Sequence, residues 1–150
     1  MDNIKKLKSS EFTRKIGEGI FKFVPLPKIN PDSVSAFSLM ISVLILFTNN
    51  INYQAVILTI VWLLGIIDGA IASKYQVRKT DEDKQKGWMV DVTTDRLSEG
   101  IISLVYFIPM FPLFILNTIL TLWSYKKKIH VILPLRQGLL AYLLIKIIIS

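Results

Sequence analysis

The chain has 150 residues, 52% of them hydrophobic, with 18 lysine or arginine and 11 aspartate or glutamate residues and a formal net charge of +7. This length suggests one domain, residues 1–150, and the apolar content lies on the membrane side of an ordinary soluble composition. Cysteine is absent, which excludes a disulfide framework and a thiolate metal site.

The basic residues are concentrated in alternate connecting segments. They cluster before residue 29, in the segment 74–86 and at residues 126–128, whereas the connectors 49–52 and 109–112 carry no charge. Positive-inside topology produces this alternation, and binding to nucleic acid does not require it. We therefore expect a multi-pass protein of the cell membrane, with no nucleic-acid partner, whose N-terminus and basic loops face the cytoplasm.

The first 28 residues are polar and basic, with apolar residues at intervals near one helical turn. These apolar residues are Ile4, Leu7, Phe12, Ile16, Ile20 and Phe23. The pattern predicts a cytoplasmic helix over residues 1–28 that lies in the membrane interface, with its lysines close to anionic lipid. A solvated helix packed on a partner is the alternative. The layout of a signal peptide is missing.

Five apolar runs follow, and each is predicted to be a membrane-spanning helix. They are residues 34–47, 53–71, 88–108, 113–125 and 131–149. The first begins after Asn30 and Pro31, a capping residue followed by proline at a first-turn position. The expected fold class is therefore all-α, a polytopic integral membrane helix bundle with five spans.

The third run contains acidic residues that are unusual in a membrane span. Asp91, Asp95 and Glu99 are spaced i, i+4 and i+8, which places them on one face of a helix. Because an ionised group at the centre of a membrane costs roughly 3 kcal/mol or more, such residues mark function. Asp68 lies near the cytoplasmic end of the second run. We expect it to meet Asp91 and Asp95 at a similar depth, in a cavity open to the cytoplasm.

Carboxylates that converge without histidine or cysteine suit a hard cation, Mg²⁺ or Mn²⁺. Such an ion would polarise a diphosphate, and nearby lysines would attract a phosphorylated substrate. A structural interpretation stays open beside this one, because Asp68 can be an ordinary helix-end residue and each acid can pair with a base. The candidate bases are Arg96, Arg136, Lys146 and the lysines of residues 74–86.

Two segments carry the most specific pattern in the chain. They read Asp68-Gly69-x-x-Ala72 and Gly87-x-x-x-Asp91-x-x-x-Asp95. This pattern resembles the motif of the CDP-alcohol phosphatidyltransferases, D-x-x-D-G-x-x-A-R-x(8)-G-x-x-x-D-x-x-x-D. Residues 30–35 are similar to the opening of that family's first helix, and Glu99 stands where archaeal-type members often have a further acid. The resemblance covers roughly residues 28–136.

The resemblance implies a six-helix fold with a cytoplasmic cavity and a role in phospholipid synthesis. In that reaction a hydroxyl acceptor attacks the phosphorus nearer the lipid or alcohol of a CDP-linked donor, and CMP leaves. On the matching positions, the resemblance assigns two divalent ions to Asp68, Asp91 and Asp95, with Asp95 as the catalytic base. The substrate and nucleotide positions that match are Gly69, Ala72, Lys74 and Gly87, and the candidate accessory residues are Glu99 and Arg136.

The chain also departs from the motif. Gly65 stands in place of the first motif aspartate and Ser73 in place of the arginine, with Lys74 beside it. The spacer 74–86 has thirteen residues where the family has eight, and five spans are predicted instead of six. The alternatives are a catalytically silent relative that binds nucleotide or lipid or serves as a partner subunit and, more distantly, a transporter with an acidic helix. A homodimer is compatible with the sequence.

Overall fold

The structure is a computed structural model that describes residues 27–75, 80–127 and 133–149. Within these ranges the chain is all-helical, with no strand. The helices are α2 (Pro31–Val43), the 3₁₀ helix η1 (Leu44–Phe47), α3 (Ile51–Lys74), α4 (Asp81–Val105), α5 (Phe107–Lys127) and α6 (Leu135–Ile149). The predicted interfacial helix over residues 1–28 lies almost wholly outside the described residues, as does the start of the fifth predicted span.

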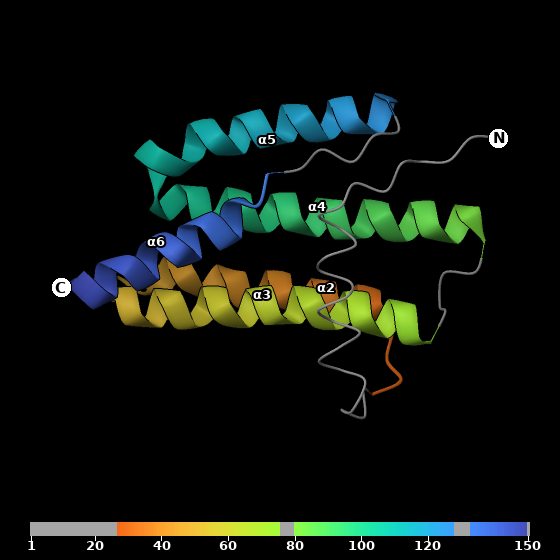
Figure 1. Cartoon of the computed structure of the whole chain (residues 1–150), viewed down its shortest axis with the longest axis horizontal. Helices are drawn as coiled ribbons and strands as arrows, with labels where there is room; N and C mark the ends of the chain where they lie inside the picture. The colour runs from red at the N-terminus through yellow and green to blue at the C-terminus, as the bar shows by residue number, and fades with distance from the viewer. Residues whose placement is uncertain (1–26, 76–79, 128–132, 150) are drawn as a thin grey trace.

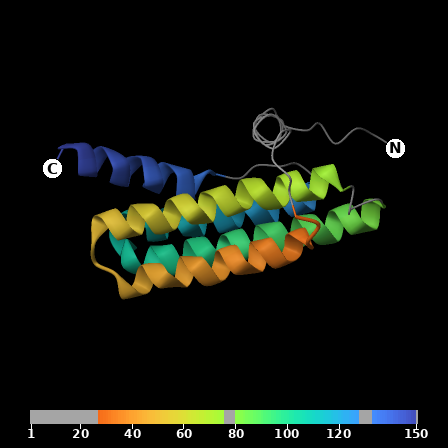
Figure 2. The same cartoon turned by 90° about the horizontal axis from the view of Figure 1, so that it is seen from below.

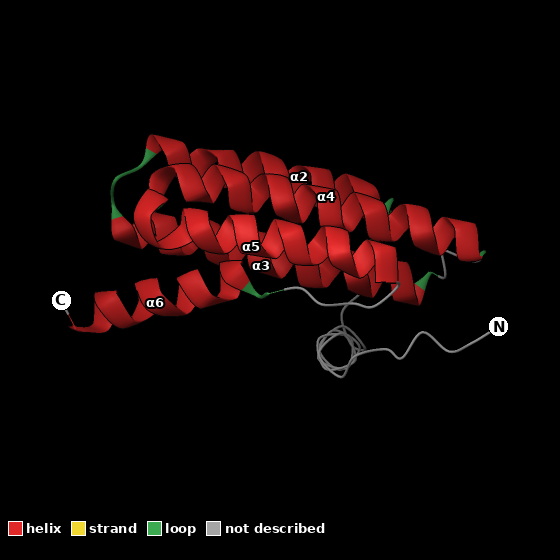
Figure 3. Cartoon of the chain, turned by 90° about the horizontal axis from the view of Figure 1, so that it is seen from above, coloured by secondary structure: helices red, strands yellow, loops and turns green. Residues whose placement is uncertain are grey.

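Helices α2 to α5 lie side by side along the long axis of the molecule (Figure 1). Helix α2 packs against both α3 and α4, and α5 packs against α4. Helix α6 crosses obliquely at the edge of this bundle, beside α3 (Figures 2 and 3). Ile45, Leu58, Ile102 and Leu143 bring η1, α3, α4 and α6 into one apolar core. The first turn of α6 is thereby placed against the middle of the bundle.

Side-chain caps define the helix starts. Asn30 accepts a hydrogen bond from the backbone of Asp32 at 3.0 Å, with Pro31 in the first turn, which confirms the predicted start of α2. Asn50 caps α3 in the same way. Thr80 and Asp83 form a reciprocal capping box at α4, and the hydrogen bonds from Thr80 hold the pKa of the Asp83 carboxyl below its usual value. Because of this box, α4 begins inside the segment 74–86, which was predicted to be a loop.

The connector predicted at residues 109–112 is wrong, because these residues belong to α5. The turn between α4 and α5 is instead a single residue, Tyr106, whose backbone leaves the helical conformation. Pro109 is tolerated because it lies in the first turn of α5, where a backbone N–H has no acceptor within the helix. Sequence reasoning took the two prolines as a break, although a proline also suits a helix start.

Two helices, α3 and α5, are long and apolar enough to cross a membrane. Five such spans were predicted, and the same criterion does not support the other three. Residues Pro31–Phe47 form a shorter apolar helix, α4 carries too many charged residues, and α6 has 15 residues.

Many large apolar side chains lie on the surface of the bundle, and several polar side chains are buried beside its apolar core. On α4, Leu97 and Leu104 are 53% and 65% exposed, whereas Ser98, Glu99 and Ser103 are buried. Exposed large apolar side chains also occur on α2, α3, α5 and α6. Soluble monomers rarely expose contiguous apolar surface on this scale. The outer surface therefore suits contact with lipid, and the polar groups face one another inside.

Candidate functional site

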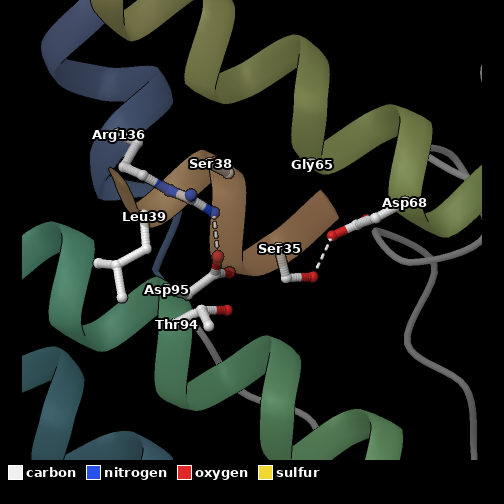
Figure 4. Close-up of a pocket in the computed structure, with 8 residues that line it drawn as sticks. All are labelled: Ser35, Ser38, Leu39, Gly65, Asp68, Thr94, Asp95 and Arg136. Carbon is white, nitrogen blue, oxygen red and sulfur yellow. Dashed lines mark hydrogen bonds and ion pairs between the residues drawn. The ribbon is translucent and has the colours of Figure 1, made fainter. Parts of the chain in front are cut away.

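A small polar cleft lies where α2, α3, α4 and the start of α6 meet (Figure 4). Its lining residues are Ser35, Ser38, Leu39, Gly65, Asp68, Thr94, Asp95 and Arg136. The cavity volume is about 10 Å³, which is roughly the space that one water molecule needs. In this conformation the cleft therefore suits a monatomic ion or a water, and a larger ligand can only place a single group in it.

Asp68 enters the cleft from the last third of α3. Its carboxylate accepts a hydrogen bond of 2.7 Å from the hydroxyl of Ser35 on α2 (Figure 4). Ser35 and Ser38 are both buried and stand on the face of α2 that packs against α3, where Ser38 also bonds the carbonyl of Val61. A charge-assisted bond of this kind orients the carboxylate without neutralising it.

Asp95 enters from the opposite side, on α4, and pairs with Arg136 of α6 across 2.5 Å (Figure 4). Asp91, one turn before Asp95, is half-buried and lies within electrostatic range of both Asp68 and Asp95. Asp68 and Asp95 therefore line one cleft, whereas Asp91 lies near it without lining it. The base that pairs with Asp95 is Arg136, in place of Arg96 or a loop lysine, which the structural alternative had named.

Glu99 does not share the cleft. It is 2% exposed, pairs with Arg96 at 2.7 Å and accepts a hydrogen bond of 3.0 Å from Asn117 of α5. The physical reason is angular drift, because eight residues on a helix rotate a side chain by about 80°. This drift carries Glu99 from the cleft to the interface with α5. The predicted alternatives for Glu99, pairing with Arg136 or Lys146, are likewise replaced by the pair with Arg96.

The residues matched to nucleotide positions do not line the cleft. On α3, Gly69 and Lys74 are exposed and Ala72 is half-buried, and Gly87 is buried on α4. The Lys74 ammonium lies 5.9 Å from the ring centroid of Tyr75. These four residues belong to the end of the bundle where α3 finishes and α4 begins, beyond the cleft.

Gly65 lines the cleft on the same helix as Asp68, one turn earlier. A Cβ atom built at this glycine meets nothing within 4 Å. The position that departs from the family motif is therefore open toward the acids, and close helix packing does not require a glycine there.

The donor atoms at this site are carboxylate and hydroxyl oxygens, which are the ligands that Mg²⁺ and Mn²⁺ prefer. In chemical type they fit a hard divalent cation. Among the residues that the structure describes, however, no three acids or histidines are gathered closely enough to form a ready-made metal site. Asp68 is turned to Ser35 and Asp95 to Arg136.

Sequence reasoning did not single out Ser38, Thr94 or Asn117, and it noted Ser35 only as part of the start of the first span. A signal existed for the serines, since Ser35, Ser38 and Ser42 recur at helical spacing in an otherwise apolar run. Asn117 is a lone amide in an apolar run. Its burial and partners depend on how α5 packs, which no local pattern specifies.

No protein-family model, curated protein or solved structure matches this chain. The similarity to the CDP-alcohol phosphatidyltransferases therefore rests on the motif residues alone.

Proposed function

We propose that the chain transfers a phospho-alcohol or phosphatidyl group from a CDP-linked donor to a hydroxyl acceptor, with release of CMP. The observation that carries this proposal is the placement of Asp68 and Asp95 on opposite sides of a polar cleft, with Asp91 one turn before Asp95, inside a bundle with an apolar exterior. Acids are costly in such a setting and are kept where they bind or react.

We further propose that α2, α4 and α6 lie in the membrane beside α3 and α5. Helix α2 together with η1 rises about 27 Å, close to the hydrocarbon thickness of about 30 Å. Aromatic residues also mark both ends of two helices: Tyr53 and Tyr75 are about 33 Å apart along α3, and Trp88 and Tyr106 about 27 Å apart along α4. Tyrosine and tryptophan concentrate at such interfaces. The charged residues of α4 between these aromatics are then shielded by the neighbouring helices.

In this reaction the acceptor oxygen bonds to the phosphorus nearer the alcohol, the bridge between the two phosphorus atoms breaks, and CMP departs with the bridging oxygen. Asp95, which pairs with Arg136 in the absence of substrate, takes the proton of the acceptor hydroxyl. A divalent cation held by Asp68, Asp91 and Asp95 would stabilise the charge that develops on the diphosphate. The nucleotide stays outside the ion-sized cleft, toward Gly69, Ala72, Lys74 and Gly87.

The proposal is tested by following CMP release from a CDP-linked lipid in detergent or vesicles, across a magnesium series and a panel of hydroxyl acceptors. Release that depends on both the cation and an acceptor, and that stops with a chelator, supports the transferase. Binding of CDP-lipid without release under any of these conditions supports a catalytically silent relative. Two observations favour this second candidate: Gly65 supplies no carboxylate, and Asp95 is engaged by Arg136.

Two substitutions in and near the cleft are expected to change the affinity for a divalent cation in opposite directions. Asp91→Asn removes a negative charge from the cleft and should weaken Mn²⁺ binding about tenfold or more, which corresponds to about 1.4 kcal/mol. Arg136→Gln removes a competing positive charge and should strengthen it by a similar factor. Arg136→Lys keeps the charge and is the matched control. Titration calorimetry on the purified proteins measures all four affinities, and equal values for wild type and Asp91→Asn would exclude the site.

The proposed topology predicts which connectors can be labelled from each side. The chain has no cysteine, so single cysteines can be introduced at exposed positions. Asn49→Cys, between η1 and α3, should react with a membrane-impermeant maleimide from outside intact cells. Gln85→Cys, in the first turns of α4, should react only after the membrane is opened. Both positions are exposed. Labelling of Asn49→Cys from the cytoplasmic side alone would overturn the orientation.

A further inference from the structure

A buried polar network connects α4, α5 and the segment that leads into α6. At its centre is Asn117 of α5, whose side chain is fully buried, at 0% exposure. Its amide nitrogen donates to the carboxylate of Glu99 at 3.0 Å and to the backbone carbonyl of Leu133 at 3.1 Å. Its amide oxygen accepts from the backbone N–H of Leu133 at 2.9 Å. One side chain thus holds both backbone groups of a residue in a connecting segment.

We call the hydrogen bonds of Asn117 to Leu133 and Glu99 the clasp, and Glu99 forms its other side. Its two carboxylate oxygens engage the guanidinium of Arg96 at 2.7 and 3.1 Å, and one of them also accepts from Asn117. Because the amide oxygen of Asn117 is occupied by Leu133, the direction of the Glu99 bond is defined: asparagine donates and glutamate accepts. The side chains of Asn117 and Glu99 are fully paired, although the Nε of Arg96 has no hydrogen-bond partner among the described residues. A paired side chain holds one arrangement firmly, since each alternative leaves a group without a partner.

Leu133, the residue held by Asn117, is close in sequence to a residue that lines the cleft. Leu133 lies two residues before the start of α6, and its carbonyl also accepts the backbone N–H of Leu135 at 2.9 Å. Arg136, the next residue, reaches Asp95 in the cleft. Asn117 itself does not line the cleft, but its hydrogen bonds to Leu133 set where α6 begins, and with it the position of Arg136.

We propose that Asn117 is a positioning residue: with Glu99 it anchors the entry to α6, so that Arg136 is delivered to Asp95. Loss of the clasp leaves α6 attached to the bundle by its apolar face, through Leu139, Leu140 and Leu143, and by the pair of Arg136 with Asp95. An apolar contact fixes the rotation and height of a helix less closely than directed hydrogen bonds do. The relevance of this anchor to catalysis rests on the proposed function, but the anchor itself does not.

The experiment exchanges donor and acceptor across the clasp. Asn117→Asp places two carboxylates against each other, and Glu99→Gln leaves Arg96 without its acid. The double variant Glu99→Gln/Asn117→Asp restores a donor facing an acceptor between positions 99 and 117, with the direction reversed, and it keeps one carboxylate near Arg96. Asp at position 117 still cannot donate to the backbone carbonyl of Leu133, so the second half of the clasp stays broken. The matched control is Thr121→Val, one turn further along α5, since the buried Thr121 hydroxyl bonds only the backbone of its own helix among the described residues.

The position of α6 is read by electron–electron spin distance measurements between labels at Gln85 on α4 and Ala141 on α6, both exposed. We expect Asn117→Asp to broaden or shift the distance distribution and Thr121→Val to leave it unchanged. The double variant should return only part of the way to the wild-type form, because the Leu133 carbonyl stays without its donor. If Asn117→Asp does not fold, Asn117→Ala takes its place.

A wild-type distribution in folded Asn117→Asp or Asn117→Ala would overturn the proposal, as would a change of the same size in Thr121→Val. These outcomes are independent of CMP release. If the spin distances behave as expected and no CMP is formed, the anchor stands and the transferase proposal fails. If CMP is formed and the spin distances do not change in the variants, the transferase proposal stands and the anchor proposal fails.

Discussion

Asp95→Asn is expected to reduce CMP release by about 10²- to 10⁴-fold, the range found when a general base is removed. Asparagine keeps the volume of the side chain but can neither accept the proton of the acceptor hydroxyl nor contribute a full negative charge to the cleft. Asp83→Asn is the matched control, because Asp83 is an acid of the same helix that caps its exposed first turn, far from the cleft.

This substitution also leaves the guanidinium of Arg136, 12% exposed, without its acid. The Asp95 side chain is 37% exposed, so removing it should cost less than the about 3–5 kcal/mol typical of a fully buried ion pair, but partial unfolding could still lower the activity. The double variant Asp95→Asn/Arg136→Gln removes both charges and should recover most of the stability, measured by thermal unfolding in detergent, while staying inactive. Wild-type activity in a folded Asp95→Asn protein would show that Asp95 has no catalytic role.

Gly65→Asp is expected to lower the magnesium concentration needed for half-maximal CMP release and to raise the rate about tenfold or more. The new carboxylate would stand three residues before Asp68, on the lining of the same cleft, where a side chain has open space. A tenfold gain in rate corresponds to about 1.4 kcal/mol of transition-state stabilisation. Replacing a glycine inside a helix also removes a source of backbone flexibility, so the fold should not suffer.

Gly65→Asn is the matched control for Gly65→Asp, since it adds nearly the same volume without the charge. Only the aspartate should change the metal requirement. If both variants behave like wild type while wild type is active, the cleft does not use a fourth carboxylate and the departure at Gly65 is neutral. If Gly65→Asp gains activity that wild type lacks, the natural chain is a silent relative whose site needs one more acid.

Much of the helical framework is encoded locally. Asn30 and Pro31 predict the start of α2, and the long apolar run of α3 predicts a helix of membrane length, because capping chemistry and burial of apolar surface act over a few turns. The shared location of Asp68, Asp91 and Asp95 also follows from sequence. A four-residue spacing keeps Asp91 and Asp95 on one face, and a short connection brings Asp68 alongside.

Which acid meets which base was decided only by the tertiary structure. Asp95 pairs with Arg136 of α6, which is 41 residues later in the sequence. Glu99 instead contacts Arg96 and Asn117. Local spacing made Asp91, Asp95 and Glu99 one row, but angular drift along α4 divides them between two interfaces. Which side chains meet at each interface depends on how α5 and α6 pack on α4. That packing is set jointly by residues far apart in the sequence. The sequence by itself determined the helices and the group of aspartates, while the fold determined their partners.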